Sequence, residues 1–87
     1  MNATNFLHFI ISSLVVHTDR IEISEKQDEL GTLLTLRVDP TDMGSIIGKS
    51  WKTIDSLRTV LRVFGTKAGI RLNLKIVEDK KDNTIWL

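Results

Sequence analysis

The sequence predicts an α+β domain with the element order α-β-β-α-α-β, in which the helices pack on one face of a three-stranded mixed sheet. Three segments carry apolar residues at helical spacing, and three others alternate polar and apolar residues. A chain of 87 residues can bury roughly 64% of its unfolded surface in one core. With 41% hydrophobic and 26% charged residues, the composition is that of an ordinary globular domain. We assign the domain to residues 1–77 and treat 78–87 as a polar tail.

The first predicted helix covers residues 4–16. Its apolar side chains recur at helical spacing, which predicts a wide and well-buried stripe of Phe6, Ile10 and Leu14 flanked by Leu7, Ile11 and Val15. The apolar stretch 6–16 is too short to span a membrane. It also lacks the preceding basic residue of a signal peptide. We therefore expect a cytoplasmic protein without a membrane partner.

Two strands follow this helix. Residues 20–24 alternate as a strand does, and the polar residues 25–29 predict a turn. The second strand, 34–38, alternates again, so that one face carries Leu34, Leu36 and Val38.

Two helices separated by a glycine loop come next. Asp39 is a suitable helix cap and Pro40 a suitable first-turn residue, and the short helix that they begin is expected to end at Gly48. A longer helix over 51–64, ended by Gly65, is predicted from the spacing of Ile54, Leu57, Leu61 and Phe64. The alternation over 70–77 predicts the third strand.

Charge is distributed unevenly along the chain. Residues 1–43 hold three basic and seven acidic side chains, whereas residues 44–77 hold seven basic side chains against Asp55 alone. This segregation favours a basic face that meets an anion over a uniformly solvated surface. Arg58 and Arg62 form a like-charge pair on one helix, which Asp55 or a bound phosphate could compensate. Two solvated surface arginines are the favoured interpretation of this pair.

The segment between the two helices, Ile46-Ile47-Gly48-Lys49-Ser50-Trp51-Lys52-Thr53-Ile54, resembles the V-I-G-K-x-G-x-x-I signature of the KH domain. The predicted element order resembles the type II KH topology. Over residues 4–77 the chain is similar to the bacterial KhpA family of small, single-KH RNA-binding proteins. The motifs that carry this similarity are Asp42-Met43-Gly44, Ile47-Gly48-Lys49 and Leu57-Arg58-Thr59-Val60.

The resemblance implies weak, low-specificity binding of single-stranded RNA. It also implies a role as an RNA chaperone or post-transcriptional regulator, a homodimer, and pairing with a second KH-containing protein. The loop chemistry fits such a role, because a glycine lets phosphate approach the free N–H groups at a helix start, where Lys49 adds positive charge. The predicted RNA-binding residues are Ile47, Gly48, Lys49, Ser50, Trp51, Lys52 and Arg58.

Three isoleucines near this loop have two possible roles. Ile46, Ile47 and Ile54, or residues of the second strand near Leu36, could form an apolar floor for the bases. They could equally belong to the core, and for most of them the core is favoured.

The second glycine of the family's G-x-x-G loop is replaced, because the sequence here is Gly48-Lys49-Ser50-Trp51. Trp51 could begin the hydrophobic stripe of the following helix. Alternatively, it is partly exposed beside the groove, where its indole either stacks on a base or covers the site.

Enzymatic chemistry is not expected. The chain has no cysteine, and neither His8 nor His17 has a metal-ligating residue four positions away. We therefore predict no catalytic residue, no metal and no cofactor. The alternative to RNA binding is a protein-interaction module with a KH fold whose loop has decayed. In that module Trp51 and Ile85-Trp86-Leu87 would make the contacts, and the terminal residues are also the candidate dimer contact.

Overall fold

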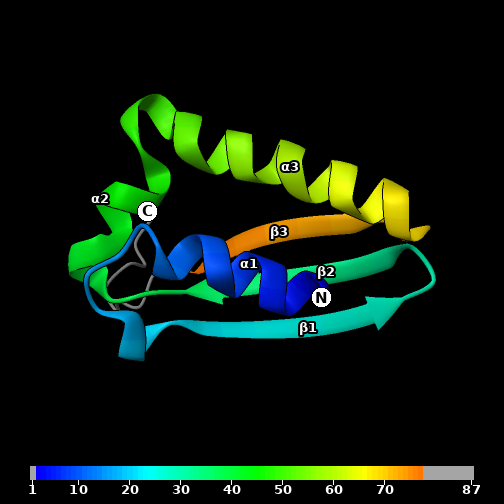
Figure 1. Ribbon diagram of the computed structural model, residues 1–87, viewed down its shortest axis with the longest axis horizontal. Helices are drawn as coiled ribbons and strands as arrows, with labels where there is room; N and C mark the ends of the chain where they lie inside the picture. The colour runs from blue at the N-terminus through cyan, green and yellow to red at the C-terminus, as the bar shows by residue number, and fades with distance from the viewer. Residues whose placement is uncertain (1, 78–87) are drawn as a thin grey trace, which may run out of the picture.

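A three-stranded sheet is covered on one face by all three helices (Figure 1). The computed structural model describes residues 2–77. The elements in chain order are α1 (Ala3–Ser12), β1 (Glu22–Asp28), β2 (Gly31–Arg37), α2 (Met43–Ile47), α3 (Lys52–Ala68) and β3 (Leu72–Val77). Short 3-10 turns lie at Thr18–Arg20, Pro40–Asp42 and Lys49–Trp51. The predicted element order and α+β class are confirmed.

The sheet has the order β1-β2-β3 and is mixed. β1 pairs antiparallel with β2, so that Glu22 lies opposite Arg37, and β2 pairs parallel with β3, so that Thr32 lies opposite Leu72. β3 has a strand partner on one side only. Its outer edge therefore presents backbone groups that no strand of residues 2–77 pairs with.

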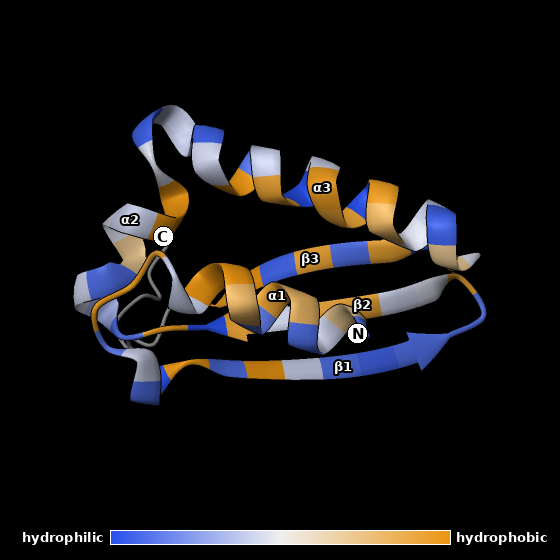
Figure 2. Ribbon diagram, in the orientation of Figure 1, coloured by the Kyte–Doolittle hydropathy of each residue, from blue (hydrophilic) through white to orange (hydrophobic). Residues whose placement is uncertain are grey.

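The core lies between the helices and the covered face of the sheet. Alternate residues of β2 point into it, as the sequence predicts, while the exposed Arg37 lies on the other face. Figure 2 shows the apolar residues of the helices and of β2 and β3 gathered toward this interior, and β1 as largely hydrophilic. The most deeply buried side chains are Leu7, Ile11, Leu34, Leu36, Ile46, Ile54, Leu61 and Val38.

The β1–β2 hairpin is longer than the sequence predicts. Residues 25–28, expected to form a turn, continue β1, and the turn itself is Glu29-Leu30. β2 begins at Gly31, three residues before the predicted start. Pairing across the sheet accounts for the difference, because β3 lies beside this end and the Thr32 N–H donates to the Arg71 carbonyl at 2.8 Å.

α3 continues past its predicted end at Phe64. Gly65 is buried inside the helix, and Gly69 ends it with a left-handed φ of 79°. The Ile70 N–H donates to the Gly65 carbonyl and the Gly69 N–H to the Thr66 carbonyl, which together form a Schellman motif. Of the two glycines, the later one has the conformation that stops the helix.

α1 is shorter and more exposed than expected. It ends at Ser12, and its buried residues are Ala3, Leu7 and Ile11, while Phe9 is largely exposed. The predicted stripe is therefore buried along only one side of the helix. No helix within residues 2–77 is long and apolar enough to cross a membrane. The predicted tail, 78–87 with Ile85-Trp86-Leu87, lies outside the described residues.

Candidate nucleic-acid interface

Gly48 gives the loop between α2 and α3 a backbone conformation that other residues avoid. Its φ of 70° and ψ of −173° fall in a region populated almost only by glycine. A Cβ at this position would also collide with Thr53, 2.7 Å from the Thr53 Cβ atom. Position 48 therefore requires glycine for its angles and for its space.

The two residues before α3 are left-handed although neither is glycine. Ser50 has φ 56° and ψ 34°, and Trp51 has φ 65° and ψ 17°. For a residue with a side chain this conformation costs roughly 1–2 kcal/mol. The backbone thus has a left-handed residue at the position where the family motif has its second glycine.

A helix start and positive charge meet at this loop. Trp51 is the N-cap residue of the 17-residue α3, and its side chain makes no capping hydrogen bond. The N–H of Lys52, the first residue of α3, donates to the Lys49 carbonyl, and an anion would meet the helix start beside this bond. The exposed Lys49 and Lys52 flank it, and the positive end of the helix dipole adds to the field.

A basic groove lies between α3 and β3 and begins at Arg58, two turns beyond the loop. The Arg58 Nε donates to the Leu74 carbonyl at 3.4 Å, and one Arg58 guanidinium nitrogen lies 3.3 Å from an Asp55 carboxylate oxygen. Asp55 thus places a negative charge beside the arginine pair, one of the possibilities that the sequence left open. Two hollows lie along this groove, one of about 70 Å³ between Arg58, Arg62 and β3, and one of about 410 Å³ between Arg62 and the end of α3.

The apolar floor offered as one possibility is wrong for most of its members. Ile46, Ile54 and Leu36 are fully buried in the core and cannot contact a ligand. Ile47 is half-buried and stays at the edge of the loop. Local spacing could not decide this, because burial depends on packing against α1 and the sheet.

Trp51 does not begin the core stripe of α3. Half of its surface is exposed, and it is absent from the core cluster and from the partly buried residues packed against it. Of the two interpretations of Trp51 from the sequence, the structure agrees with the second, in which the side chain is partly exposed beside the loop.

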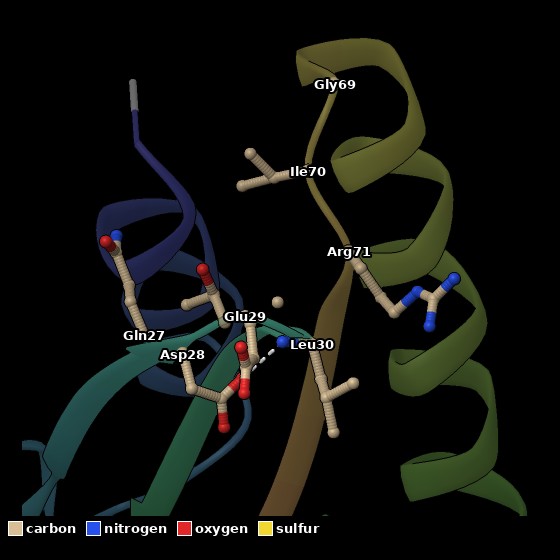
Figure 3. A pocket seen from close by; sticks show the side chains of 9 residues that line it. Gln27, Asp28, Glu29, Leu30, Gly69, Ile70 and Arg71 are labelled. Atoms are coloured by element: carbon tan, nitrogen blue, oxygen red, sulfur yellow. Dashed lines mark hydrogen bonds between the residues drawn. The ribbon is translucent and has the colours of Figure 1, made fainter.

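The hollow in Figure 3, about 490 Å³, lies at the far end of the molecule between the β1–β2 turn and the chain that links α3 to β3. The acidic Asp28 and Glu29 line it together with Arg71. The length of α3, about 25 Å at 1.5 Å per residue, separates it from the glycine loop. It is therefore not part of the interface.

The structure brings the predicted site residues together in one region. Ile47, Gly48, Lys49, Ser50, Trp51 and Lys52 form the loop, and Arg58 lies two turns further along α3. The other basic residues of this half are spread out, because Arg71 lies beyond the far end of α3 and Lys75 points to the uncovered face of the sheet. The acidic side chains of β1 lie at the opposite edge of the sheet from β3.

Sequence reasoning missed Thr53 and the Leu74 carbonyl. Thr53 fills the space beside Gly48, and the carbonyl receives Arg58. A backbone carbonyl carries no sequence signal, and its contact crosses 16 positions of the chain. No pattern of neighbouring residues in the sequence predicts the contact between Arg58 and the Leu74 carbonyl.

A second feature that sequence reasoning missed is the set of hydrogen bonds made by Asp42, the residue before α2. The buried Asp42 carboxylate accepts from the N–H groups of Val16 and His17, at 3.0 and 2.9 Å, and lies 3.0 Å from His17 Nδ1. The N–H donors, that of Val16 foremost, lower the pKa of Asp42 below 3.8. The hydrogen bond with Asp42 raises the pKa of His17 above 6.5. Asp42 therefore joins the end of α1 to the start of α2, in addition to lying near the positive helix end.

Comparison with known proteins agrees with this geometry. A family model described as "KhpA/KhpB, KH domain" matches residues 4–76. A protein of Aquifex aeolicus named RNA-binding protein KhpA is 38% identical over 65 residues, which cover 75% of this chain and 82% of that protein. One of the same name from Chlamydia caviae is 36% identical over 76 residues, covering 87% and 97%. A third, from Halalkalibacterium halodurans, is 38% identical over 69 residues, covering 79% and 91%.

Proposed function

The chain belongs to the KhpA/KhpB KH-domain family, and from this we propose that it binds single-stranded RNA, weakly and with little sequence preference. The binding residues would be Gly48, Lys49, Ser50, Trp51 and Lys52 with Ile47 at the loop edge and Arg58 in the groove. In the cell we infer an RNA chaperone or post-transcriptional regulator in the cytoplasm. The KhpA family of RNA-binding proteins is non-enzymatic, in agreement with the sequence analysis.

One observation supports this proposal above the others. The glycine-specific conformation of Gly48 and the left-handed residues after it place the start of the 17-residue α3, with its positive dipole end, between two exposed lysines. A phosphate is the anion that such an arrangement suits, since it can accept several N–H bonds and a lysine contact at once. A KH loop holds about four backbone nucleotides in this manner.

The groove supports a path for the nucleotides beyond the loop. Arg58 and Arg62 line one side, and the free edge of β3 lines the other. Unpaired backbone groups of an edge strand can hydrogen-bond to base edges, and guanidinium groups can meet phosphates. Phosphate contacts carry no sequence information, so the low specificity proposed here requires that they outweigh the contacts to base edges.

Fluorescence anisotropy with a pool of short, labelled single-stranded RNAs tests the proposal. Lys49→Asp and Lys52→Asp should each weaken binding across the pool. Each should also reduce the steepness of log affinity against log salt by about 0.7 for every phosphate that the variant no longer neutralises. Lys26→Asp is the matched control, because Lys26 is an exposed lysine on β1 at the other edge of the sheet.

Two results would contradict the proposal. If all three lysine variants behave alike, the loop is not the binding site. If the parent protein binds no RNA even at low salt, the alternative function, a protein-interaction module with a decayed loop, takes its place.

We also propose that the chain self-associates through an apolar surface of α1 and α3. Phe6 and Phe64 stack with their ring centroids 4.8 Å apart, and Phe9, Val60 and Val63 are exposed within about one helical turn of this pair. α1 carries no acidic or basic side chain apart from His8, so two copies could meet there without like-charge repulsion. The occupant we propose is a second copy of this chain. A second KH-containing protein, suggested by the family name, would use the same surface.

A further inference from the structure

Trp51 has a backbone conformation that its side chain disfavours. It is left-handed, with φ 65°, at the position where a glycine would adopt the same angles without strain. Strained residues persist only where the surrounding structure holds them, and they cluster at binding and active sites. The choice of tryptophan at this position therefore needs a reason.

Packing does not supply that reason. Half of the Trp51 surface is exposed, and the residue is not among those that form or cover the core. Within residues 2–77 the stacked aromatic pair is Phe6 with Phe64, so the Trp51 ring has no aromatic partner in the described part of the chain. An indole that contributes little to the core is left open to a ligand.

The surroundings of Trp51 are those of a nucleic-acid contact. Lys49 and Lys52 lie within two positions of it, and α3, with its positive dipole end, begins directly after it. Arg58 and Arg62 follow seven and eleven positions later, which places them on the same side of the helix as its N-cap. An aromatic face among cations that hold phosphates is the combination that proteins use for unpaired nucleotides.

We propose that Trp51 is the base-stacking residue of this interface. One unstacked base lies against the indole while the adjacent phosphates meet the loop N–H groups, Lys49 and Lys52. This inference rests on the proposed function and narrows its ligand to single strands with at least one unpaired base, because both faces of a base within a duplex are already stacked. Purines are preferred modestly at that position, since their larger rings stack more strongly.

Two substitutions of Trp51 distinguish base stacking by its aromatic ring from an effect of its side-chain size on the loop. Trp51→Phe retains an aromatic ring, whereas Trp51→Leu retains apolar bulk without one. Both keep a side chain on the left-handed residue, so the backbone strain is similar in the two variants. Far-UV circular dichroism and the urea midpoint establish that each variant is folded.

The probe is a short, labelled oligoadenylate, together with versions that each lack one base at a different position. Trp51→Leu should bind the intact probe about 5- to 150-fold more weakly than the parent, and Trp51→Phe should lose less. One abasic position should weaken the parent by a similar factor and leave Trp51→Leu unchanged. That coupling between a side chain and a single base is not expected if Trp51 only shapes the loop.

A second readout is indole fluorescence. The chain has two tryptophans, so Trp86→Phe leaves Trp51 as the sole emitter. RNA should quench its emission, and the probe that lacks the coupled base should quench it less.

Equal affinities of the parent and Trp51→Leu would overturn the inference, as would a loss that is the same for every abasic probe. Trp51→Gly binding more tightly than the parent would mean that the indole covers the site, and would also overturn it. In either case a weakened Lys49→Asp variant would leave the proposed function standing. A parent that binds no RNA would remove the proposed function and this inference together.

Discussion

Gly48 and Gly44 are both glycines of the α2 region, but they meet opposite structural demands. Gly48 has a positive φ and Thr53 against it, whereas Gly44 is helical with nothing within 4 Å of the place where a Cβ would stand. The sequence predicts that the helix ends at Gly48. Only Gly48 interrupts the helix, because only there does the backbone leave the helical region.

Alanine substitutions should separate the two glycines. Gly48→Ala should lower the free energy of unfolding by about 1–3 kcal/mol from backbone strain alone, and should weaken RNA binding by displacing the loop. Gly44→Ala should be neutral or stabilising by up to about 1 kcal/mol, since alanine favours a helix. Urea denaturation and RNA anisotropy measure both effects. Equal urea midpoints for the two variants would contradict this account of position 48.

The contact between His17 and Asp42 predicts a dependence of stability on pH. The pKa of His17 is raised above 6.5 by its hydrogen bond with Asp42, with Asp39 and Asp19 adding to the effect. Its contribution is therefore fully present below pH 6.5 and is lost as the pH rises through the folded-state pKa. The pKa of Asp42 is lowered below 3.8, so its contribution is present above pH 3.8 and is lost as the pH falls through the folded-state pKa.

His17→Gln should flatten the alkaline side of this profile. The urea midpoint of the parent should be lower at about pH 8 than at about pH 5. The decrease should be smaller in His17→Gln. His8→Gln, on the exposed side of α1, serves as the control and should retain the parent's profile. If His17→Gln retains that profile as well, the pair does not couple stability to pH.

At the scale of elements, α3 connects the candidate interface to the far end of the sheet. Its buried residues recur as Ile54, Leu57, Leu61 and Gly65, so the last position of the stripe has no side chain. The chain that leads to β3 passes over that gap. An ideal Cβ on Gly65 would lie 2.7 Å from the Ile70 carbonyl oxygen and 3.2 Å from Leu72 Cγ.

Gly65→Ala should therefore destabilise the fold although alanine is the better helix former. We expect a loss of about 1–3 kcal/mol, typical of overpacking against atoms that cannot move away. Ser56→Ala, at an exposed position of the same helix, should be neutral or slightly stabilising. Thermal and urea denaturation measure both. A Gly65→Ala variant as stable as Ser56→Ala would show that Ile70 and Leu72 can move away from the added methyl group at little cost.

For the whole molecule, acidic and basic charge lie on opposite edges of the sheet. The acidic residues of β1 are at one edge, and the groove between α3 and β3 is at the other. The near-neutral net charge of +1 conceals this separation. An RNA approaching from solution is therefore attracted to the α3–β3 side and repelled by the β1 side.

Self-association also belongs to this scale. At high concentration the parent should have about twice the 9.9 kDa chain mass in light scattering. Val63→Glu should shift it toward the monomer, because a carboxylate would have to be buried in the contact. Leu30→Glu, at a similarly exposed apolar residue of the β1–β2 turn, is the control and should remain dimeric.

A parent that stays monomeric at every concentration would contradict the proposed dimer. Removal of residues 78–87 tests the other dimer contact, Ile85-Trp86-Leu87. If that deletion alone changes the mass, the tail makes the contact and the surface of α1 and α3 does not.

The sequence by itself determined the order of the elements, the faces of β2, the cap at Asp39 and the position of the glycine loop, although Asp39 caps the 3-10 turn Pro40–Asp42 and α2 itself begins at Met43. Each depends on residues within a few positions of one another, through periodicity or capping. The Asp39 side chain accepts from the Thr41 N–H, as its cap assignment requires.

Only the tertiary structure decided the length of the hairpin, the end of α3, the burial of Ile46 and Ile54, the partners of Asp42, and the exposure of Trp51. In each case the deciding contact or packing partner comes from a distant part of the chain, as when Asp42 binds the N–H groups of Val16 and His17. A local pattern cannot contain such information, because the free energy of a buried or paired group depends on what the fold places against it.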